Sequence, residues 1–469
     1  MILSRYFSKG DYGTYKQVMY VYNTLLGVFS LGLPRAYSYF IPKAQPSEVY
    51  SLINKISSLF FILGGVFSLF LFFFSEPIAS LLANPDLGKA LRLFSPTPFL
   101  LLPTMGLEGV YASFRKTLYS SVYTVITRVL VVFCTVSPVL FFHGSYLDSI
   151  IGFDLASLFA CVLAVALKTW PVKNNPRERT SVTYKDILLF SLPLLYASLW
   201  GIILASANQF FVSRFFGKEV FAEFSNGYTE IPVVGMVLSA VATILLPIFS
   251  GKSIDGQMDN DSVSLWRAAL VKSAKIIYPI LVFSIVFSKQ FMTCLYGNFY
   301  ESSYVYFIIK NVGGLFFIIP FAPVIIAIGK TRDYANAHMI AAIAIVVLEY
   351  LCVSLFPSPV LIAIISELCQ LIKIIFLMSV IVRYSDLSIK EFFPINELVK
   401  VLGLALGSSI LARFLTLAFS NKFIVLLSGS LFCLVIYYCV CFIFKLSYKQ
   451  IVSSFLGDKR FHRIKRFIP

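Results

Sequence analysis

Charged side chains are scarce in this sequence. Asp, Glu, Lys and Arg make up only 13% of the 469 residues, whereas 58% are hydrophobic; a soluble domain has about 25% charged residues. No polar stretch is long enough to fold as a separate soluble domain. The composition therefore predicts an integral membrane protein with no nucleic-acid partner, and most of the net charge of +16 is expected in cytoplasmic loops, where Lys and Arg accumulate.

Motifs for metal, redox or nucleotide chemistry are also lacking. The three histidines, His143, His338 and His462, are far apart, and the eight cysteines form no CxxC pair. We therefore expect no metal ion and interpret the cysteines as small buried hydrophobes. Gly329-Lys330-Thr331 resembles the end of a phosphate-binding loop. Such a loop needs a second glycine five residues before Gly329, and the residue there is Val324. The sequence thus predicts no cofactor and no catalytic residues, so the protein is not expected to be an enzyme.

Long apolar runs, in contrast, are abundant. A helix needs about 20 mostly apolar residues to cross a bilayer, and thirteen segments meet this requirement. They are 12–33, 56–74, 93–113, 118–142, 146–167, 187–213, 231–249, 268–287, 303–328, 337–356, 359–382, 398–418 and 423–444. Lys and Arg are concentrated in every second loop between them, which predicts a cytoplasmic C-terminus and places Met1 on the outer side.

The two halves of the chain share a motif. Leu3-Ser4-Arg5-Tyr6-Phe7-Ser8-Lys9 aligns without a gap with Val212-Ser213-Arg214-Phe215-Phe216-Gly217-Lys218, which indicates a duplicated membrane bundle. The segment 187–213 precedes the second copy, but only residues 1–3 precede the first. We therefore expect that a first helix of about 20 residues is missing, as a misplaced start codon would cause. A protein with thirteen helices is the alternative.

The expected fold is all-α and integral to the membrane. Two pseudo-symmetric six-helix lobes surround a central cavity, with the pseudo-twofold axis along the membrane normal. The longest polar break, 168–184, separates the lobes. The expected parts are a first lobe at 1–170 that lacks its first helix, a cytoplasmic linker at 171–185, a second lobe at 186–384, two additional transmembrane helices at 385–446 and a basic cytoplasmic tail at 447–469.

Several motifs resemble those of one protein family. They are Tyr6-Phe7-Ser8-Lys9-Gly10-Asp11-Tyr12-Gly13-Thr14-Tyr15, Leu31-Gly32-Leu33-Pro34, Tyr228-Thr229-Glu230-Ile231-Pro232 and Leu295-Tyr296-Gly297-Asn298-Phe299-Tyr300. They are similar to motifs of polysaccharide transporters, the lipid-linked oligosaccharide or O-antigen flippases of the multidrug/oligosaccharidyl-lipid/polysaccharide flippase superfamily. The resemblance covers nearly the whole chain. The sequence departs from the family pattern at two points: the missing first helix, and Asn208, where many relatives carry an acid.

This resemblance implies a flippase of the bacterial inner membrane. Such a protein moves undecaprenyl-pyrophosphate-linked oligosaccharide to the periplasmic leaflet by alternating access, for the synthesis of O-antigen, capsule or exopolysaccharide. The implied partners are the lipid-linked substrate, membrane lipids, a polysaccharide polymerase and a chain-length regulator. A multidrug–cation antiporter of the same superfamily is one alternative, and it would favour an acidic cavity. An oligosaccharide polymerase is another, and it would need a large external loop.

Two polar stripes indicate a binding site. Lys16 and Asn23 share one face of the segment 12–33, and Glu223, Asn226 and Glu230 have helical spacing in the related part of the second lobe. A charged residue within a membrane helix costs about 2.5–3.5 kcal/mol, so these charges require an explanation. We expect the two stripes to face each other across the cavity.

A large anionic head group needs a wet, basic pocket while its lipid tail stays in the bilayer. Lys16 and Arg5 are therefore expected to hold phosphate, and Arg35 is expected at the cytoplasmic mouth. Glu223 or Glu230 would pair with Lys16 in the empty state or carry a coupling proton. Alternatively, Lys16 and Glu223 extend to the outer membrane interface.

Other polar residues within the segments are secondary candidates. Asn208 and Gln209 are expected to contact sugar hydroxyls, and Glu108 is a further candidate for coupling or for a counter-ion. Arg128 and Lys310 also lie within segments. The charges expected to form ion pairs inside the second lobe are Glu349, Glu367 and Lys373.

Overall fold

The computed structural model describes residues 1–252, 260–318, 321–385, 393–444 and 446–449, and these contain helices but no β-strand. Most of the predicted basic tail, from residue 450 on, lies outside the described residues. Contacts divide the chain into two compact units, Met1–Ala222 and Glu223–Pro469. The all-α fold expected from the apolar runs is therefore confirmed.

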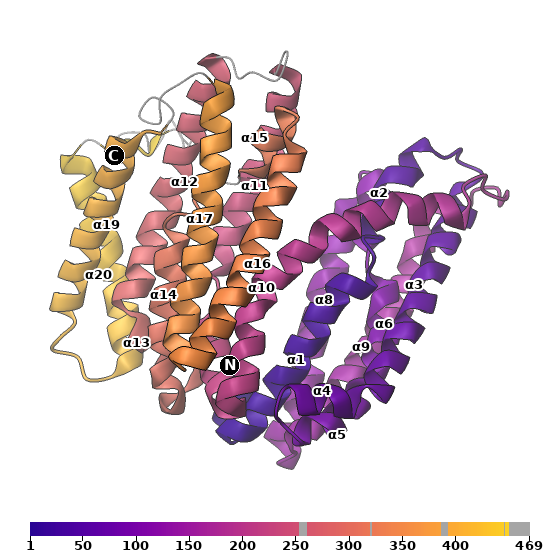
Figure 1. Cartoon of the computed structure of the whole chain (residues 1–469), viewed down its shortest axis with the longest axis horizontal. Helices are drawn as coiled ribbons and strands as arrows, with labels where there is room; N and C mark the ends of the chain where they lie inside the picture. The colour runs from indigo at the N-terminus through magenta and orange to yellow at the C-terminus, as the bar shows by residue number, and fades with distance from the viewer. Residues whose placement is uncertain (253–259, 319–320, 386–392, 445, 450–469) are drawn as a thin grey trace. The chain divides into compact units, whose positions relative to one another are not determined.

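The first unit contains the helices up to Ala222, near the end of α10. In it, α3, α6 and α9 lie side by side (Figure 1). Its elements are η1 (Leu3–Arg5), α1 (Lys9–Phe29), α2 (Pro34–Phe40), η2 (Ile41–Lys43), α3 (Val49–Phe73), α4 (Ser75–Leu81), α5 (Asp86–Phe94), α6 (Pro96–Leu101), η3 (Leu102–Thr104), α7 (Leu107–Ser113), α8 (Thr117–Phe142), α9 (Tyr146–Thr169), η4 (Trp170–Val172) and α10 (Tyr184–Gly227) as far as Ala222.

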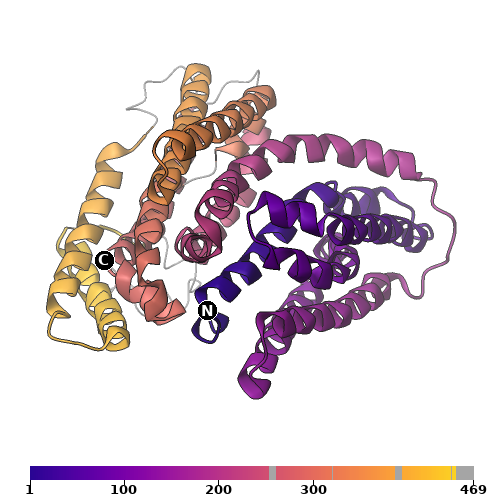
Figure 2. The same ribbon diagram turned by 60° about the horizontal axis from the view of Figure 1, so that its bottom comes forward.

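The second unit contains the end of α10 and the remaining helices. They are α11 (Pro232–Lys252), α12 (Asn260–Val286), α13 (Ser288–Tyr296), η5 (Asn298–Ser303), α14 (Tyr304–Gly314), α15 (Ala322–Ala327), α16 (Thr331–Leu355), α17 (Pro359–Ser385), α19 (Ile395–Leu415) and α20 (Lys422–Ile443). The last two pack on each other, with α19 against α12 and α20 against α13 (Figure 2).

Among the described residues, eight helices are long and apolar enough to cross a membrane, and a ninth results if the two parts of α10 are counted as one span bent by 43°. The eight coincide with eight of the thirteen predicted segments. Helices α8 and α20 are the most exposed of the eight: in each, only 17% of the apolar stretch is buried within the protein. Apolar side chains that stay exposed on such helices suit contact with lipid.

Two predicted spans are broken rather than continuous. The segment 93–113 is divided among α5, α6, η3 and α7, because Pro96, Pro98 and Pro103 remove backbone donors and Gly106 has a left-handed φ of 78°. The segment 303–328 is likewise divided between α14 and α15. The two breaks occupy equivalent places in the predicted repeat.

The structure places Lys168 in the protein interior, whereas the sequence predicted it at the start of a polar break. It lies in α9 with 1% of its surface exposed. Its ammonium donates hydrogen bonds to the Tyr37 hydroxyl at 3.0 Å, to the Pro103 carbonyl at 2.8 Å and to the Met105 carbonyl at 2.6 Å. Two carbonyls at the end of η3 and the Tyr37 hydroxyl of α2 therefore hold this lysine in the interior of the first unit, where the sequence pattern had indicated a solvated loop.

The predicted linker packs on the first unit. The Ser47 hydroxyl donates to the Glu178 carboxylate at 2.8 Å, and Lys55 donates to the Val182 carbonyl at 2.6 Å. The Arg177 guanidinium lies 4.3 Å from the centre of the Tyr50 ring. These contacts fix the segment between α9 and α10 against α3 and the connection that precedes it.

Candidate functional site

Helix α1 carries the first predicted stripe. It begins at Lys9 because the Ser8 hydroxyl accepts a hydrogen bond from the Asp11 backbone N–H at 3.1 Å, which satisfies a donor of the first turn. Lys16 follows about two turns later. Its side chain is half-buried, and its Nζ lies 5.8 Å from the centre of the Tyr12 ring.

Arg5 and Lys16 lie in one neighbourhood of the first unit. Burial lowers the pKa of the Met1 amine to about 6, and the positive charges of Lys16 and Arg5 contribute to this shift. Arg5 itself is exposed at the end of η1. Both predicted phosphate ligands therefore act electrostatically on the N-terminal amine.

Asn23 and Arg35 lie farther away. Asn23 is exposed about two turns beyond Lys16, and Arg35 is exposed in the first turn of α2. Because α1 has 21 residues, it is about 32 Å long. Arg35 therefore lies near the opposite end of α1 from Arg5 and belongs to a different part of the unit.

A buried hydrogen-bond network that the sequence did not indicate lies beside Lys16. The Gln17 amide donates to the Ser213 hydroxyl at 2.7 Å. The Asn84 amide donates to the Gln17 carbonyl oxygen at 2.5 Å and to the Thr14 hydroxyl at 3.0 Å. All four side chains are at most 2% exposed. The network joins α1 to α10 and to the turn before α5.

Three further predicted residues lie on α10 and α7. Asn208 is 2% exposed, and its Oδ1 has no hydrogen-bond partner among the described residues. Gln209, the next residue of α10, is half-buried. Glu108 is exposed in the first turn of α7. The Tyr20 hydroxyl of α1 donates to the Ser206 carbonyl at 3.2 Å, so Asn208 and Gln209 lie on a stretch of α10 that packs along α1.

The predicted acidic stripe does not form one helical face. Helix α10 ends at Gly227 and α11 begins at Pro232, so Glu230 lies in the connection, where it is exposed. A residue that precedes proline avoids helical backbone angles, which explains the break. Glu223 and Asn226 do lie on α10; Glu223 is half-buried and Asn226 is buried.

A cluster of charged residues occupies the interior of the second unit. Lys310 of α14 forms an ion pair with Glu367 of α17, with 3.0 Å between Nζ and Oε1, and the Tyr228 hydroxyl donates to the same oxygen. This confirms the expected pairing of Glu367, although its partner is Lys310 rather than Lys373. Lys373 instead donates to the Gln370 carbonyl oxygen at 2.6 Å.

Glu349 of α16 completes this cluster. It is fully buried, and its Oε1 accepts a hydrogen bond from the Ser366 hydroxyl at 2.7 Å. The ion pair expected for Glu349 is therefore wrong in the described part of the chain, where its partner is a neutral hydroxyl. Lys310 and Glu367 are 57 positions apart, so only the packing of α14 against α17 brings them together.

Asp154 is a carboxyl group within a span that the sequence analysis did not single out. It lies on α9 and accepts a hydrogen bond from the Thr97 hydroxyl of α6. An acid in the interior of the apolar segment 146–167 was the signal that could have identified it. It is half-buried. Like the buried carboxyls of α16 and α17 in the second unit, it lies on a long apolar helix.

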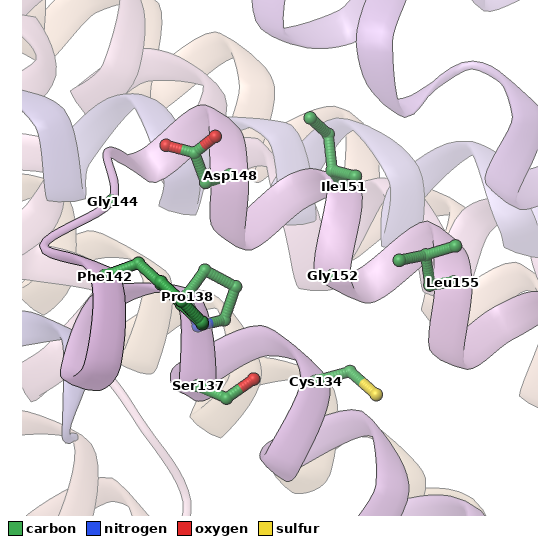
Figure 3. A pocket seen from close by; sticks show the side chains of 9 residues that line it. All are labelled: Cys134, Ser137, Pro138, Phe142, Gly144, Asp148, Ile151, Gly152 and Leu155. Carbon is green, nitrogen blue, oxygen red and sulfur yellow. The ribbon is translucent and has the colours of Figure 1, made fainter.

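A hollow of about 450 Å³ lies between α8 and α9 (Figure 3). Its walls include Cys134, Ser137 and Pro138 of α8 and Asp148 and Ile151 of α9. The Asp148 carboxylate accepts hydrogen bonds from the backbone N–H and the hydroxyl of Ser145, as the cap of α9. Its negative charge disfavours a phosphorylated ligand, so this hollow does not suit the predicted substrate.

Solved structures of membrane transporters share this fold. The lipid II flippase MurJ in an inward closed conformation aligns over 96% of this chain and 95% of its own, with a TM-score of 0.71 and 15% sequence identity. An inward-facing multidrug resistance MATE family transporter of the MOP superfamily aligns over 82% of this chain and 95% of its own, with a TM-score of 0.64 and 13% identity. The Vibrio cholerae MATE transporter VcmN in its bent form aligns over 81% and 89%, with a TM-score of 0.52 and 13% identity.

These alignments define the class: the chain has the fold of multi-pass membrane transporters and flippases. Sequence then gives the family. Residues 2–305 match the profile of a family described as polysaccharide biosynthesis protein, so the chain belongs to that family. This agrees with the resemblance found in its motifs. No curated protein sequence matches the chain.

Proposed function

We propose that this protein is a flippase that moves undecaprenyl-pyrophosphate-linked oligosaccharides across the bacterial inner membrane, for the synthesis of O-antigen, capsule or exopolysaccharide. The observation that carries the proposal is the match of residues 2–305 to a polysaccharide biosynthesis family in a chain with a transporter fold. A polysaccharide biosynthesis protein that is built as a membrane transporter has to handle a substrate that crosses the bilayer.

The mechanism follows from the two-sided chemistry of such a substrate. Its polyprenyl tail is stable in hydrocarbon, whereas its diphosphate and sugars are not. We propose that Lys16 and Arg5 hold the diphosphate in a hydrated chamber between two lobes, at 1–170 and 186–384. The chamber would open alternately to the two sides of the membrane. Asn23, Asn208, Gln209 and Asn226 would contact sugar hydroxyls, and Arg35 would attract the substrate at the cytoplasmic mouth.

Coupling to an ion gradient is proposed for acids that lie on or beside the chamber. Glu223, Glu230 or Glu108 would neutralise Lys16 in the empty state or carry a proton across. The cytoplasmic C-terminus, the linker at 171–185 and the two additional helices at 385–446 complete the proposed topology. A polysaccharide polymerase and a chain-length regulator are the proposed protein partners.

A multidrug–cation antiporter is the second candidate, because MATE transporters share the fold. The positive charges of Lys16 and Arg5 in the proposed site would disfavour a cationic drug. Drug efflux measured in whole cells separates the two functions. Sensitivity of a deletion strain to cationic dyes, with normal surface polysaccharide, would favour the antiporter.

The deciding experiment measures where the lipid-linked oligosaccharide accumulates. In a deletion strain, the substrate should build up on the cytoplasmic leaflet, with loss of surface polysaccharide. Unchanged surface polysaccharide and no accumulation would overturn the proposal.

Lys16→Ala tests the proposed diphosphate ligand in the same strain. The variant should insert into the membrane normally and fail to restore surface polysaccharide, because the head group loses a positive charge that holds it. Lys89→Ala is the matched control, since Lys89 is an exposed cation on α5 of the same unit and should restore it fully. Normal polysaccharide with Lys16→Ala would remove this residue from the site.

A further inference from the structure

We infer that Lys310 and Lys373 form a second diphosphate-binding site, in which Glu367 is a built-in counter-ion that gives up Lys310 to the ligand by taking up a proton. This deepens the proposed function and rests on it for the identity of the ligand. None of the residues predicted from sequence to bind substrate belongs to this site.

The geometry of the ion pair is that of an exchangeable contact. Lys310 of α14 and Glu367 of α17 lie on neighbouring helices (Figure 1), and their side chains are 25% and 8% exposed. The carboxylate is thus enclosed, whereas the ammonium has an open side. The same ammonium lies 5.0 Å from the centre of the Tyr228 ring, which favours a positive charge at this place in any state.

Lys373 supplies a second positive charge close to this pair. Its only polar contact in the described part of the chain is with Gln370, one turn back on the same helix, and it forms no ion pair there. Lysine side chains on a helix point toward its N-terminus, so Lys373 extends toward the level of Glu367. A charge at this depth in an apolar helix is costly without a counter-ion, and two ammonium groups on facing helices match the two phosphates of a diphosphate.

Glu367 is placed to accept the proton. Its Oε2 is buried and has no hydrogen-bond partner among the described residues. A Cβ at position 313 would lie only 1.9 Å from this oxygen, so Gly313 makes the room that the carboxyl occupies. The ionisable groups around it are Tyr228, Lys310, Lys373 and, through Ser366, Glu349.

The exchange balances without any covalent change in the ligand. A phosphate oxygen takes the place of Glu367 Oε1 on the Lys310 ammonium, and Glu367 takes one proton from water on Oε2. Tyr228 continues to donate to Oε1, which stays an acceptor in the neutral carboxyl. Ligand binding is therefore coupled to the uptake of one proton.

The experiment uses the full chain in phosphatidylcholine nanodiscs with farnesyl diphosphate as the probe. Calorimetric titration in two buffers of different ionisation enthalpy gives both the affinity and the number of protons taken up. The wild type should take up close to one proton near pH 7. Lys310→Gln and Lys373→Gln should each weaken binding at least about tenfold, whereas Glu367→Gln should bind without proton uptake. Lys289→Gln, which removes a lysine paired with Glu301 elsewhere in the unit, is the control and should match the wild type.

Wild-type affinity in both lysine variants, or proton uptake that persists in Glu367→Gln, would overturn the inference. The double variant Lys310→Gln/Glu367→Gln keeps a neutral hydrogen-bonding pair, so a folded protein that still binds with wild-type affinity would overturn it too. Farnesol should not compete, which separates the diphosphate from the prenyl tail. If these results hold but the deletion strain accumulates no lipid-linked oligosaccharide, the site stands and the flippase proposal fails. If the deletion strain accumulates lipid-linked oligosaccharide but farnesyl diphosphate does not bind, the flippase proposal stands and the second site fails.

Discussion

Lys168 in the first unit and Lys310 in the second show how the same side chain serves different purposes inside membrane helices. Lys168 is enclosed by the Tyr37 hydroxyl and two backbone carbonyls. Lys310 is partly exposed and pairs with a carboxylate. A backbone carbonyl oxygen takes up no proton, whereas a carboxylate can become a neutral carboxyl group. The comparison teaches that the partner decides whether a buried lysine is a fixed element of the fold or an exchangeable one.

Lys168→Met tests the fixed lysine and should have the largest effect. It leaves the Pro103 and Met105 carbonyls without their donor, which should lower the free energy of unfolding by roughly 3 kcal/mol. Lys310→Met should cost less, about 1–2 kcal/mol, because Glu367 can become neutral and keep Tyr228 as donor. Unfolding in mixed micelles, followed by labelling of the buried Cys161, measures both. Lys173→Met on the adjacent turn is the control, and equal losses in the two lysine variants would contradict the comparison.

Gln17→Leu tests the neutral network of the first unit and should have an intermediate effect. The substitution removes contacts with both Asn84 and Ser213, and one buried amide is left with fewer partners. We expect a loss of about 2 kcal/mol in the free energy of unfolding. None of these groups titrates between about pH 5 and 8, so the loss should be the same across this range. Gln209→Leu, at a half-buried position of α10, is the control. A loss that varied with pH would show that the network is coupled to a charged group.

The spans were predictable because length and apolar composition are properties of one segment. The eight confirmed spans show this, whereas 93–113 was predicted as one span although its three prolines explain why it is broken. Asp154 was equally visible as an acid in an apolar run. In contrast, nothing local distinguishes Lys168 from the loop residues that follow it, since its burial depends on carbonyls 63 and 65 positions away. The pairing of Lys310 with Glu367 depends on helix packing in the same way.

Glu301 belongs to an ion cluster at the surface of the second unit. Its substitution should have the smallest effect on stability of the changes compared. Lys289 donates to its carboxylate at 2.7 Å and Lys422 at 2.8 Å. Hydrogen bonds from these lysines, Lys289 first, hold the pKa of Glu301 below its usual value of 4.5. A carboxyl whose pKa is lowered by folding contributes stability above its unfolded pKa, and this contribution is lost as the pH falls through its folded pKa. Water screens such exposed pairs, so the contribution is small.

Glu301→Gln should therefore lower the melting temperature slightly at neutral pH, and the difference from the wild type should shrink as the pH falls below about 4.5. Added salt should shrink it as well, because salt screens exposed charges. Melting curves of both proteins at several pH values and at two salt concentrations test this. Glu76→Gln provides a matched surface pair, since Glu76 contacts Arg92 at 3.1 Å in the first unit. If Glu301→Gln destabilised the protein as much as Lys168→Met does, the connection of α20 to η5 through Lys422 would be a fixed element of the fold. Exposure would then no longer separate exchangeable from fixed lysines.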